Sequence, residues 1–378
     1  MKPSFCLAAA LACLPLPAAG VSGSPIMAGP GLVVDDRGSP SETRALRRIA
    51  ASLARSRTAA GLLQELAIIG NAKIAFSSSA ASRKDESAPF DPDRITIQGT
   101  LAWANFTEPQ LRVFLDEKLL PYSPDRVAPI LAHELLGHSL PLLKADKAGL
   151  GRSVFARFDG AELYASMVDS AVGLELRLES YEDEASRLMR STAAYVAEIR
   201  FWGAGYALAL SREEAADPAT AYRKRLTMAR ASLRDLAGER LRWKAREALL
   251  KHLLDEDGMN RAVLRTARVE VRYRLDTYLP DRRERLPQVI KALEEELAYG
   301  RTPTGKSDWK LLAEAAGHPF LKELDEKILF LQSRLRDLRP DAAPPRKEWA
   351  DWSAVQGIAE EDLRRHDGLD PKAVQSAF

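Results

Sequence analysis

Residues 133–138 read His-Glu-Leu-Leu-Gly-His, and this string constrains the fold more than any other part of the 378-residue chain. Protein ligands to zinc converge on one point at about 2.0–2.2 Å, and the common zinc helix achieves this with two histidines four residues apart. His133 and His138 are separated by five positions (138 − 133), so a regular α-helix would place them about 140° apart instead of about 40°. We therefore expect a π-type turn near Gly137, because glycine tolerates a distorted backbone.

Glu134 directly follows the first histidine of this string. A carboxylate at that position can take a proton from water beside the metal. The chain contains five histidines, and the spacing of two of them around a glutamate and a glycine favours a metal site over two incidental histidines. We expect His133 and His138 to bind Zn²⁺, with Glu134 as the catalytic base.

The string resembles the HExxGH signature of the dipeptidyl peptidase III family of zinc peptidases. Through that family it is similar to the wider gluzincin group of zincins, in which a downstream glutamate completes the metal site. The resemblance implies that His133 and His138 bind zinc, that Glu134 activates the zinc-bound water, and that the chain hydrolyses peptide bonds. It covers six residues and a weaker acidic motif, in a chain much shorter than the family's usual enzymes. It supports the metal chemistry and not the release of dipeptides.

The third ligand is expected from an acidic stretch at residues 173–185, where several carboxylates lie beside an apolar helical stripe. Glu179 and Asp183 are four residues apart, so one helix would stack them on the same face. In gluzincin-like sites, which this arrangement resembles, the first carboxylate binds zinc and the second orients a ligating histidine. We therefore predict Glu179 as the metal ligand and Asp183 as its outer partner. The competing ligands are Glu182, Glu175 and Glu184.

The expected fold class is α+β and predominantly helical, because alanine, leucine and arginine are abundant and aromatic residues are few. We expect a zincin-like catalytic region at residues 41–204, which contains a small sheet. A flexible leader rich in Gly, Ser and Pro is expected at 21–40. A helical C-terminal region is expected at 205–340, and a polar tail at 341–378.

Within the catalytic region, the apolar spacing predicts two helices at residues 41–66 and a strand at 73–76. Residues 95–105 alternate and predict the edge strand beside the cleft, where a peptide can add by main-chain hydrogen bonds. A helix is expected at 108–119, followed by the metal helix at 125–139.

The N-terminus is typical of a secretory signal, with the positively charged Lys2, an apolar run at 5–16 and small residues after it. We expect residues 1–20 to be cleaved and the protein to be exported, either to the periplasm or out of the cell. Both cysteines, Cys6 and Cys13, lie in this segment, so the mature chain has no disulfide. The alternatives are an ordinary apolar helix and a lipoprotein.

The charges nearly balance, with 55 basic and 53 acidic residues. This balance gives no reason to expect nucleic acid or an anionic membrane as partner, and the basic residues at 223–286 are interleaved with acidic ones. The expected partner is a peptide or protein substrate. Two other functions stay open. One is a zinc hydrolase of a non-peptide amide or ester, and the other is a helical scaffold protein with a structural or vestigial metal site.

Overall fold

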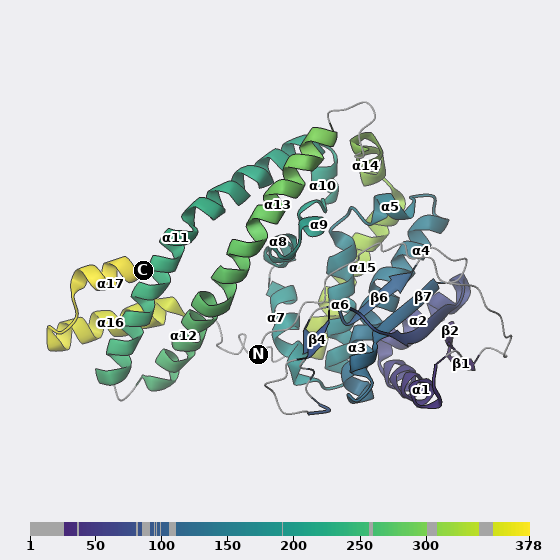
Figure 1. Ribbon diagram of the computed structural model, residues 1–378, viewed down its shortest axis with the longest axis horizontal. Coiled ribbons are helices and arrows are strands. Elements are labelled where there is room, and N and C mark those ends of the chain that lie inside the picture. Colours follow the sequence, from purple (N-terminus) through teal and green to yellow (C-terminus); the bar gives the residue numbers. More distant parts are fainter. Residues whose placement is uncertain are drawn as a thin grey trace. The chain divides into compact units, whose positions relative to one another are not determined.

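The structure is a computed structural model of the chain. It describes residues 26–35, 38–80, 82–84, 91–93, 95, 97–98, 100–105, 111–190, 192–256, 260–300, 308–339 and 351–378. The expected signal segment at 1–20 lies outside these residues. The predicted fold class is confirmed, because the protein is predominantly helical α+β with one small mixed sheet (Figure 1).

The chain divides into two compact units, each made of separate stretches of sequence. Unit 1 comprises residues 1–196, 210–216 and 310–340, and unit 2 comprises residues 197–209, 217–309 and 341–378. This division differs from the expected one, in which all of 205–340 formed a single C-terminal region. Residues 310–340 belong to unit 1 because the helix α15 (Pro319–Leu338) packs against α6 (Gly160–Glu175).

The five strands of the main sheet lie in the order β1-β2-β3-β7-β6. They are β1 (Ile26–Gly29), β2 (Leu32–Val34), β3 (Ala72–Ser77), β7 (Leu111–Asp116) and β6 (Ala102–Asn105). The central strands β2, β3 and β7 run parallel, whereas β1 and β6 pair antiparallel at the two ends. The short strands β4 (Arg83–Lys84) and β5 (Ile97–Gln98) pair separately. Of the edge strand predicted at 95–105, residues 102–105 form β6 at the edge of the main sheet, whereas Ile97–Gln98 belongs to the separate pair.

Two parts of this sheet differ from the expectation. The leader expected at 21–40 contains β1 and β2, because Leu32, Val33 and Val34 form a buried apolar strand within a Gly-rich context. The helix expected at 108–119 is β7 followed by the short 3₁₀ helix η1 (Glu117–Leu119). Leu111, Val113 and Leu115 are buried in alternation, which is the period of a strand between two others.

The helices of unit 1 surround this sheet and include the predicted pair at the N-terminal side, separated at Ser56. The hydroxyl of Ser56 accepts from the amide of Ala59 and so caps the second helix. The predicted pair is α1 (Pro40–Arg55) and α2 (Arg57–Ile69). Besides α6 and α15, the other α-helices of unit 1 are α3 (Pro124–Ala132), α4 (Leu140–Lys147), α5 (Arg152–Phe155), α7 (Glu182–Arg190), α10 (Arg212–Ala215) and α14 (Trp309–Ala316).

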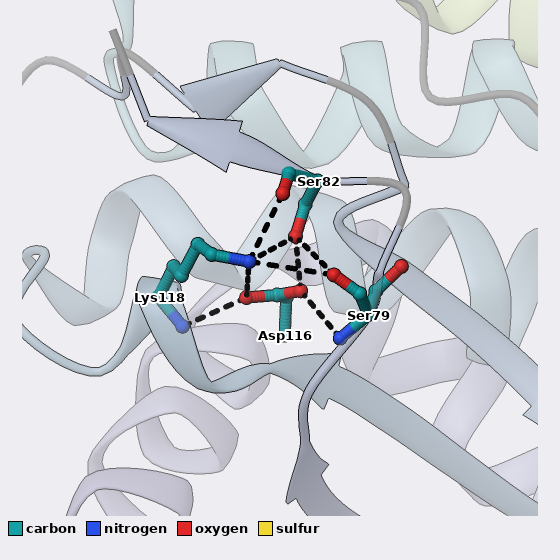
Figure 2. Close-up of polar contacts among 4 residues, drawn as sticks. All are labelled: Ser79, Ser82, Asp116 and Lys118. Atoms are coloured by element: carbon teal, nitrogen blue, oxygen red, sulfur yellow. Dashed lines mark hydrogen bonds and ion pairs between the residues drawn. The ribbon is translucent and has the colours of Figure 1, made fainter. Parts of the chain in front are cut away.

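A buried polar cluster fixes the chain just after β3 to the end of β7 (Figure 2). The carboxylate of Asp116, which is fully buried, accepts from the amides of Ser79 and Lys118 at 3.0 and 2.8 Å and from the hydroxyl of Ser82. The Lys118 ammonium donates to the Ser82 hydroxyl at 2.7 Å and to the carbonyl of Ser82 at 3.0 Å. These contacts join the segment after β3 to the end of β7.

Unit 2 is a long helical hairpin closed at one end by two more helices. Its elements are α9 (Ala204–Ala207), α11 (Pro218–Glu256), α12 (Arg261–Tyr273), the π-helix η4 (Arg274–Tyr278), α13 (Leu279–Tyr299), α16 (Trp352–His366) and α17 (Pro371–Ala377). The helix α8 (Thr192–Trp202) spans the boundary between the units. The segment expected as a polar tail therefore supplies α16 and α17, whose buried Val355 and Val374 join the hairpin core. No helix in the described ranges has the length and apolar character required to cross a membrane.

Candidate metal centre

The predicted π-type turn is confirmed. Residues His133–Ser139 form the π-helix η2 between α3 and α4, and the amide of Leu140 donates to the carbonyl of Leu135 five residues back. The hydroxyl of Ser139 also donates to the carbonyl of Glu134 at 2.6 Å. This turn aligns the two imidazoles, which five-residue spacing on a regular helix would point apart.

Three side chains converge in front of this turn: His133, His138 and Glu162. The Nε2 atoms of the two histidines are 3.1 Å apart. Glu162 Oε2 lies 3.1 Å from His138 Nε2, and Glu162 Oε1 lies 3.6 Å from His133 Nε2. Tetrahedral zinc with ligands at about 2.05 Å requires ligand atoms roughly 3.3 Å apart. The three separations bracket that value, so the three side chains could hold one metal ion, and the spacing is compatible with zinc among other metals.

Asp169 contacts the ring nitrogen of His133 that faces away from the site. Its Oδ2 lies 2.9 Å from His133 Nδ1, and its Oδ1 accepts from the hydroxyl of Ser170 at 3.2 Å. A carboxylate on Nδ1 keeps the proton on that nitrogen and leaves the Nε2 lone pair directed at the site. The site therefore includes an inner carboxylate and an outer carboxylate, as expected from the sequence, but with different residues.

Both carboxylates come from α6, which packs directly against η2. Glu162 and Asp169 are seven residues apart (169 − 162), or about two helical turns, and so lie on one face of the helix. The side chain of Glu162 is 8% exposed, whereas that of His138 is 26% exposed. The site is thus buried on the α6 side and accessible beside His138.

Gly137 allows α6 to approach the π-turn closely. A Cβ atom on Gly137 would lie 2.5 Å from the Cα atom of Ala165 and 2.6 Å from its Cβ. Gly137 does not have a positive φ, so the expected reason for this glycine, backbone distortion, is replaced by a steric one. Its missing side chain sets the distance between the histidines and the helix that carries Glu162.

We expect Gly137→Ala to displace α6 and to lower the free energy of unfolding by roughly 1–3 kcal/mol, as overpacking does. The same displacement should weaken metal binding, because Glu162 lies three residues before Ala165. Urea unfolding and metal titration would measure the two effects. The control is Gly61→Ala on α2, where no atom lies within 4 Å of the added Cβ. That change should stabilise the fold by roughly 0.4–1 kcal/mol. Equal behaviour of the two variants would contradict the steric role of Gly137.

The electrostatics of the site follow from burying three carboxylates beside two imidazoles. Burial acts to lower the pKa of His133, but the hydrogen bond that its ring donates to Asp169 and the charges of Glu162, Asp169 and Glu134 outweigh it and raise that pKa to about 10. Burial raises the pKa of Glu134, against the opposing charges of His138 and His133. For Glu162, burial is outweighed by the charge and hydrogen bond of His138, and its pKa is lowered.

These shifts predict that metal and proton compete for His133. In the metal-free protein the pKa of His133 is raised from 6.5 to about 10, so the stabilisation from its charged form is complete below pH 6.5 and is lost as pH rises through 10. A metal needs the neutral ring. Apparent zinc affinity should therefore rise about tenfold per pH unit in the neutral to mildly alkaline range, with release of about one proton per zinc.

Calorimetry in buffers of different ionisation enthalpy would count the released protons. Asp169→Asn should lower the pKa of His133 and flatten this pH dependence, while weakening zinc binding at neutral pH by roughly 10–100-fold. A wild-type affinity that does not change with pH would contradict the competition.

The predicted third ligand, Glu179, is not part of the site. It is exposed in the 3₁₀ turn η3 (Glu179–Tyr181), whereas Glu162 is the carboxylate beside both histidines. The acidic stretch is not one helix, because α6 ends at Glu175 and Arg177 adopts a left-handed backbone with φ 61°. Asp183 lies on α7, with its side chain outside the described part, and Asp169 has the outer role predicted for it.

The competing carboxylates also have other partners. Glu175 accepts from the Ser56 hydroxyl at 2.6 Å and from Arg334 Nη2 at 2.9 Å, which ties α6 to α2 and α15. Glu182 forms an ion pair with Arg339 at 3.2 Å. Glu184 is buried and accepts from the hydroxyl of Tyr195 at 2.7 Å. Burial and the nearby charge of Asp169 raise the pKa of Glu184 to about 7.

Sequence reasoning missed Glu162 and Asp169. The available signal was the contrast between these two carboxylates and the apolar residues around them in α6, most of which are buried. A charged residue in a helix buried on nearly all sides needs a partner, whereas the denser acidic run after it was exposed or paired elsewhere.

Comparison of the chain with protein-family models, with curated proteins and with solved structures found no match.

Proposed function

We propose that this protein is a zinc-dependent hydrolase that cleaves peptide bonds. The observation that supports it best is the convergence of His133, His138 and Glu162 at separations of 3.1–3.6 Å, next to a glutamate that follows the first histidine. A purely structural zinc site is normally closed by four protein ligands. Three ligands beside a free carboxylate are the arrangement of a hydrolytic site.

Bound zinc would polarise the substrate carbonyl and acidify a water molecule. Glu134 would accept the proton of that water on its carboxylate and transfer it to the departing amine. Burial raises the pKa of Glu134. A raised pKa suits this role, because the carboxylate must keep the proton it takes from water until it transfers it to the amine. Asp169 would keep the proton of His133 on Nδ1.

The edge strand β6 supports a peptide substrate. It pairs with β7 along one side and lies at the end of the sheet, and it contacts the π-turn that carries both histidines. An extended peptide could add to the other side of β6 as a further antiparallel strand, through main-chain hydrogen bonds. This placement would bring its carbonyl groups to the metal site without requiring a particular side chain.

The test is to load the purified mature protein with zinc and digest a mixed peptide library. We expect about one zinc per chain and cleavage that a chelator abolishes and zinc restores. Absence of bound zinc after zinc is offered would overturn the enzyme proposal. Stoichiometric zinc without cleavage of any peptide, amide or ester would favour the scaffold alternative. Cleavage of an amide or ester but no peptide would favour the non-peptide hydrolase.

We also propose that the protein is exported, on the strength of the N-terminal signal pattern alone. Expression of the full chain and N-terminal sequencing of the exported product should show cleavage close to residue 20. A protein that stays in the cytoplasm with its first residues intact would contradict export, and it would leave the metal proposal unaffected.

A further inference from the structure

The outward face of α12 in unit 2 carries a row of arginines. The arginine row consists of Arg261, Arg265, Arg268 and Arg272, all of which are exposed. At 100° per residue they fall within a sector of about 60°, and at 1.5 Å per residue the row is about 16 Å long. The helix thus places on one face four arginines that are separated by other residues in the sequence.

The acidic residues of α12 and η4 do not pair with the last three arginines of the row. Glu270, the acidic residue of α12, is buried and pairs with Arg274 at 2.6 Å. The next acidic residue, Asp276, follows in η4 beyond the end of the row. Within the described ranges no carboxylate lies within ion-pair distance of the last three arginines of the row.

Three other exposed basic residues of unit 2 have an acidic partner one helical turn away. Such pairs are Arg364–Glu360, Arg365–Glu361 and Lys291–Glu295. In the arginine row, by contrast, the residues one turn apart are themselves arginines, and like charges at that spacing repel one another. The face is therefore electrostatically unfavourable in isolation and would be stabilised by an array of negative charges.

We propose that the arginine row is a docking surface for a phospholipid bilayer that contains anionic headgroups. A straight row on a convex helix can contact a flat surface with all four guanidinium groups at once, and each group can bind a phosphate through two parallel hydrogen bonds. Val269, which is 60% exposed, lies beside the row, as suits an interface between water and lipid. No aromatic side chain belongs to the row, so it lacks the stacking groups of a single-stranded nucleic-acid surface.

The whole-chain charge of +2 argued against an anionic membrane because it averages over both units. Binding to a surface depends on the local charge within about one Debye length, roughly 8–10 Å. The last three arginines of the row alone should enrich the protein on an anionic bilayer by roughly a hundredfold. Such binding is reversible and independent of zinc.

The test is co-sedimentation of the full chain with vesicles of phosphatidylcholine, with or without about 30% phosphatidylglycerol, a fraction that gives an anionic surface. We expect binding to the anionic vesicles alone, with loss at high salt. The double variant Arg265→Gln/Arg268→Gln should bind roughly 30-fold more weakly. The matched control Arg364→Gln/Arg365→Gln removes the same charge from acid-paired arginines of α16 and should bind like wild type.

Thermal melts of both variants would show that neither is unfolded. The proposal is wrong if the wild-type protein does not bind anionic vesicles, or if both variants lose binding equally. It is also wrong if duplex DNA binds through the same arginines more tightly than the vesicles do, since the surface would then serve a nucleic acid. None of these outcomes depends on the hydrolase proposal.

Discussion

Glu134→Gln is expected to lower peptide hydrolysis by roughly 10²–10⁴-fold while zinc stays bound. Glutamine has nearly the shape of glutamate but cannot accept a proton, and Glu134 is not among the three groups that converge on the ion site. The loss should therefore appear in the rate and not in the metal content. Peptide cleavage rates and zinc stoichiometry, measured on the same preparation, would check both parts.

The control for this variant is Glu314→Gln on α14, an exposed glutamate outside the site, which should cleave at the wild-type rate. A Glu134→Gln protein that lost its zinc and kept hydrolysis would show that the role of Glu134 has been assigned wrongly. A protein that kept both would remove the reason for calling Glu134 the base.

Glu162→Gln is expected to weaken zinc binding by more than the roughly 10–100-fold that outer-shell changes cause. Its carboxylate is the one beside both imidazoles, and its side chain is 8% exposed. A neutral amide in its place removes one of three ligands and the negative charge that balances the ion. Competition with a fluorescent zinc chelator would measure the change.

Glu179→Gln is the matched control, because it removes the same charge from an exposed carboxylate in the same region of sequence. It should bind zinc like the wild-type protein. If Glu179→Gln weakened binding and Glu162→Gln did not, the ligand first expected from the sequence would be correct and the geometry of the site would be misassigned. Melting curves would separate lost affinity from lost folding.

The part of the site that sequence could predict is the part determined by spacing. Two histidines five residues apart can share an ion only through a local i→i+5 turn, and η2 has that turn. The third member of the cluster, Glu162, comes from a different helix. Its position depends on how α6 crosses the π-turn, and that crossing depends on the contact of Gly137 with Ala165. No periodicity within either helix specifies it.

The fold was predictable to a similar extent. Local patterns predict the helical class, the first two helices and the edge strand. In each case the apolar residues recur with the spacing of a helix or the alternation of a strand. The central strand β7 was assigned as helix, because a short segment with apolar residues at 111, 113, 114 and 115 fits both periods and only pairing with β3 and β6 decides. The position of α15 in unit 1 depends on contacts across more than a hundred residues, such as Arg334 with Glu175.

The division of the chain also has a consequence for the order of assembly during synthesis. Residues 217–309 belong to unit 2, yet they are made before α15, which covers α6 in unit 1. Until α15 has emerged from the ribosome, the helix that carries Glu162 and Asp169 lacks one of its packing partners. Domains that finish folding early do so from contiguous sequence, and unit 1 is not contiguous. The packing around the proposed metal site is therefore complete only after α15 has been synthesised, so we expect any metal uptake there to follow synthesis of that helix.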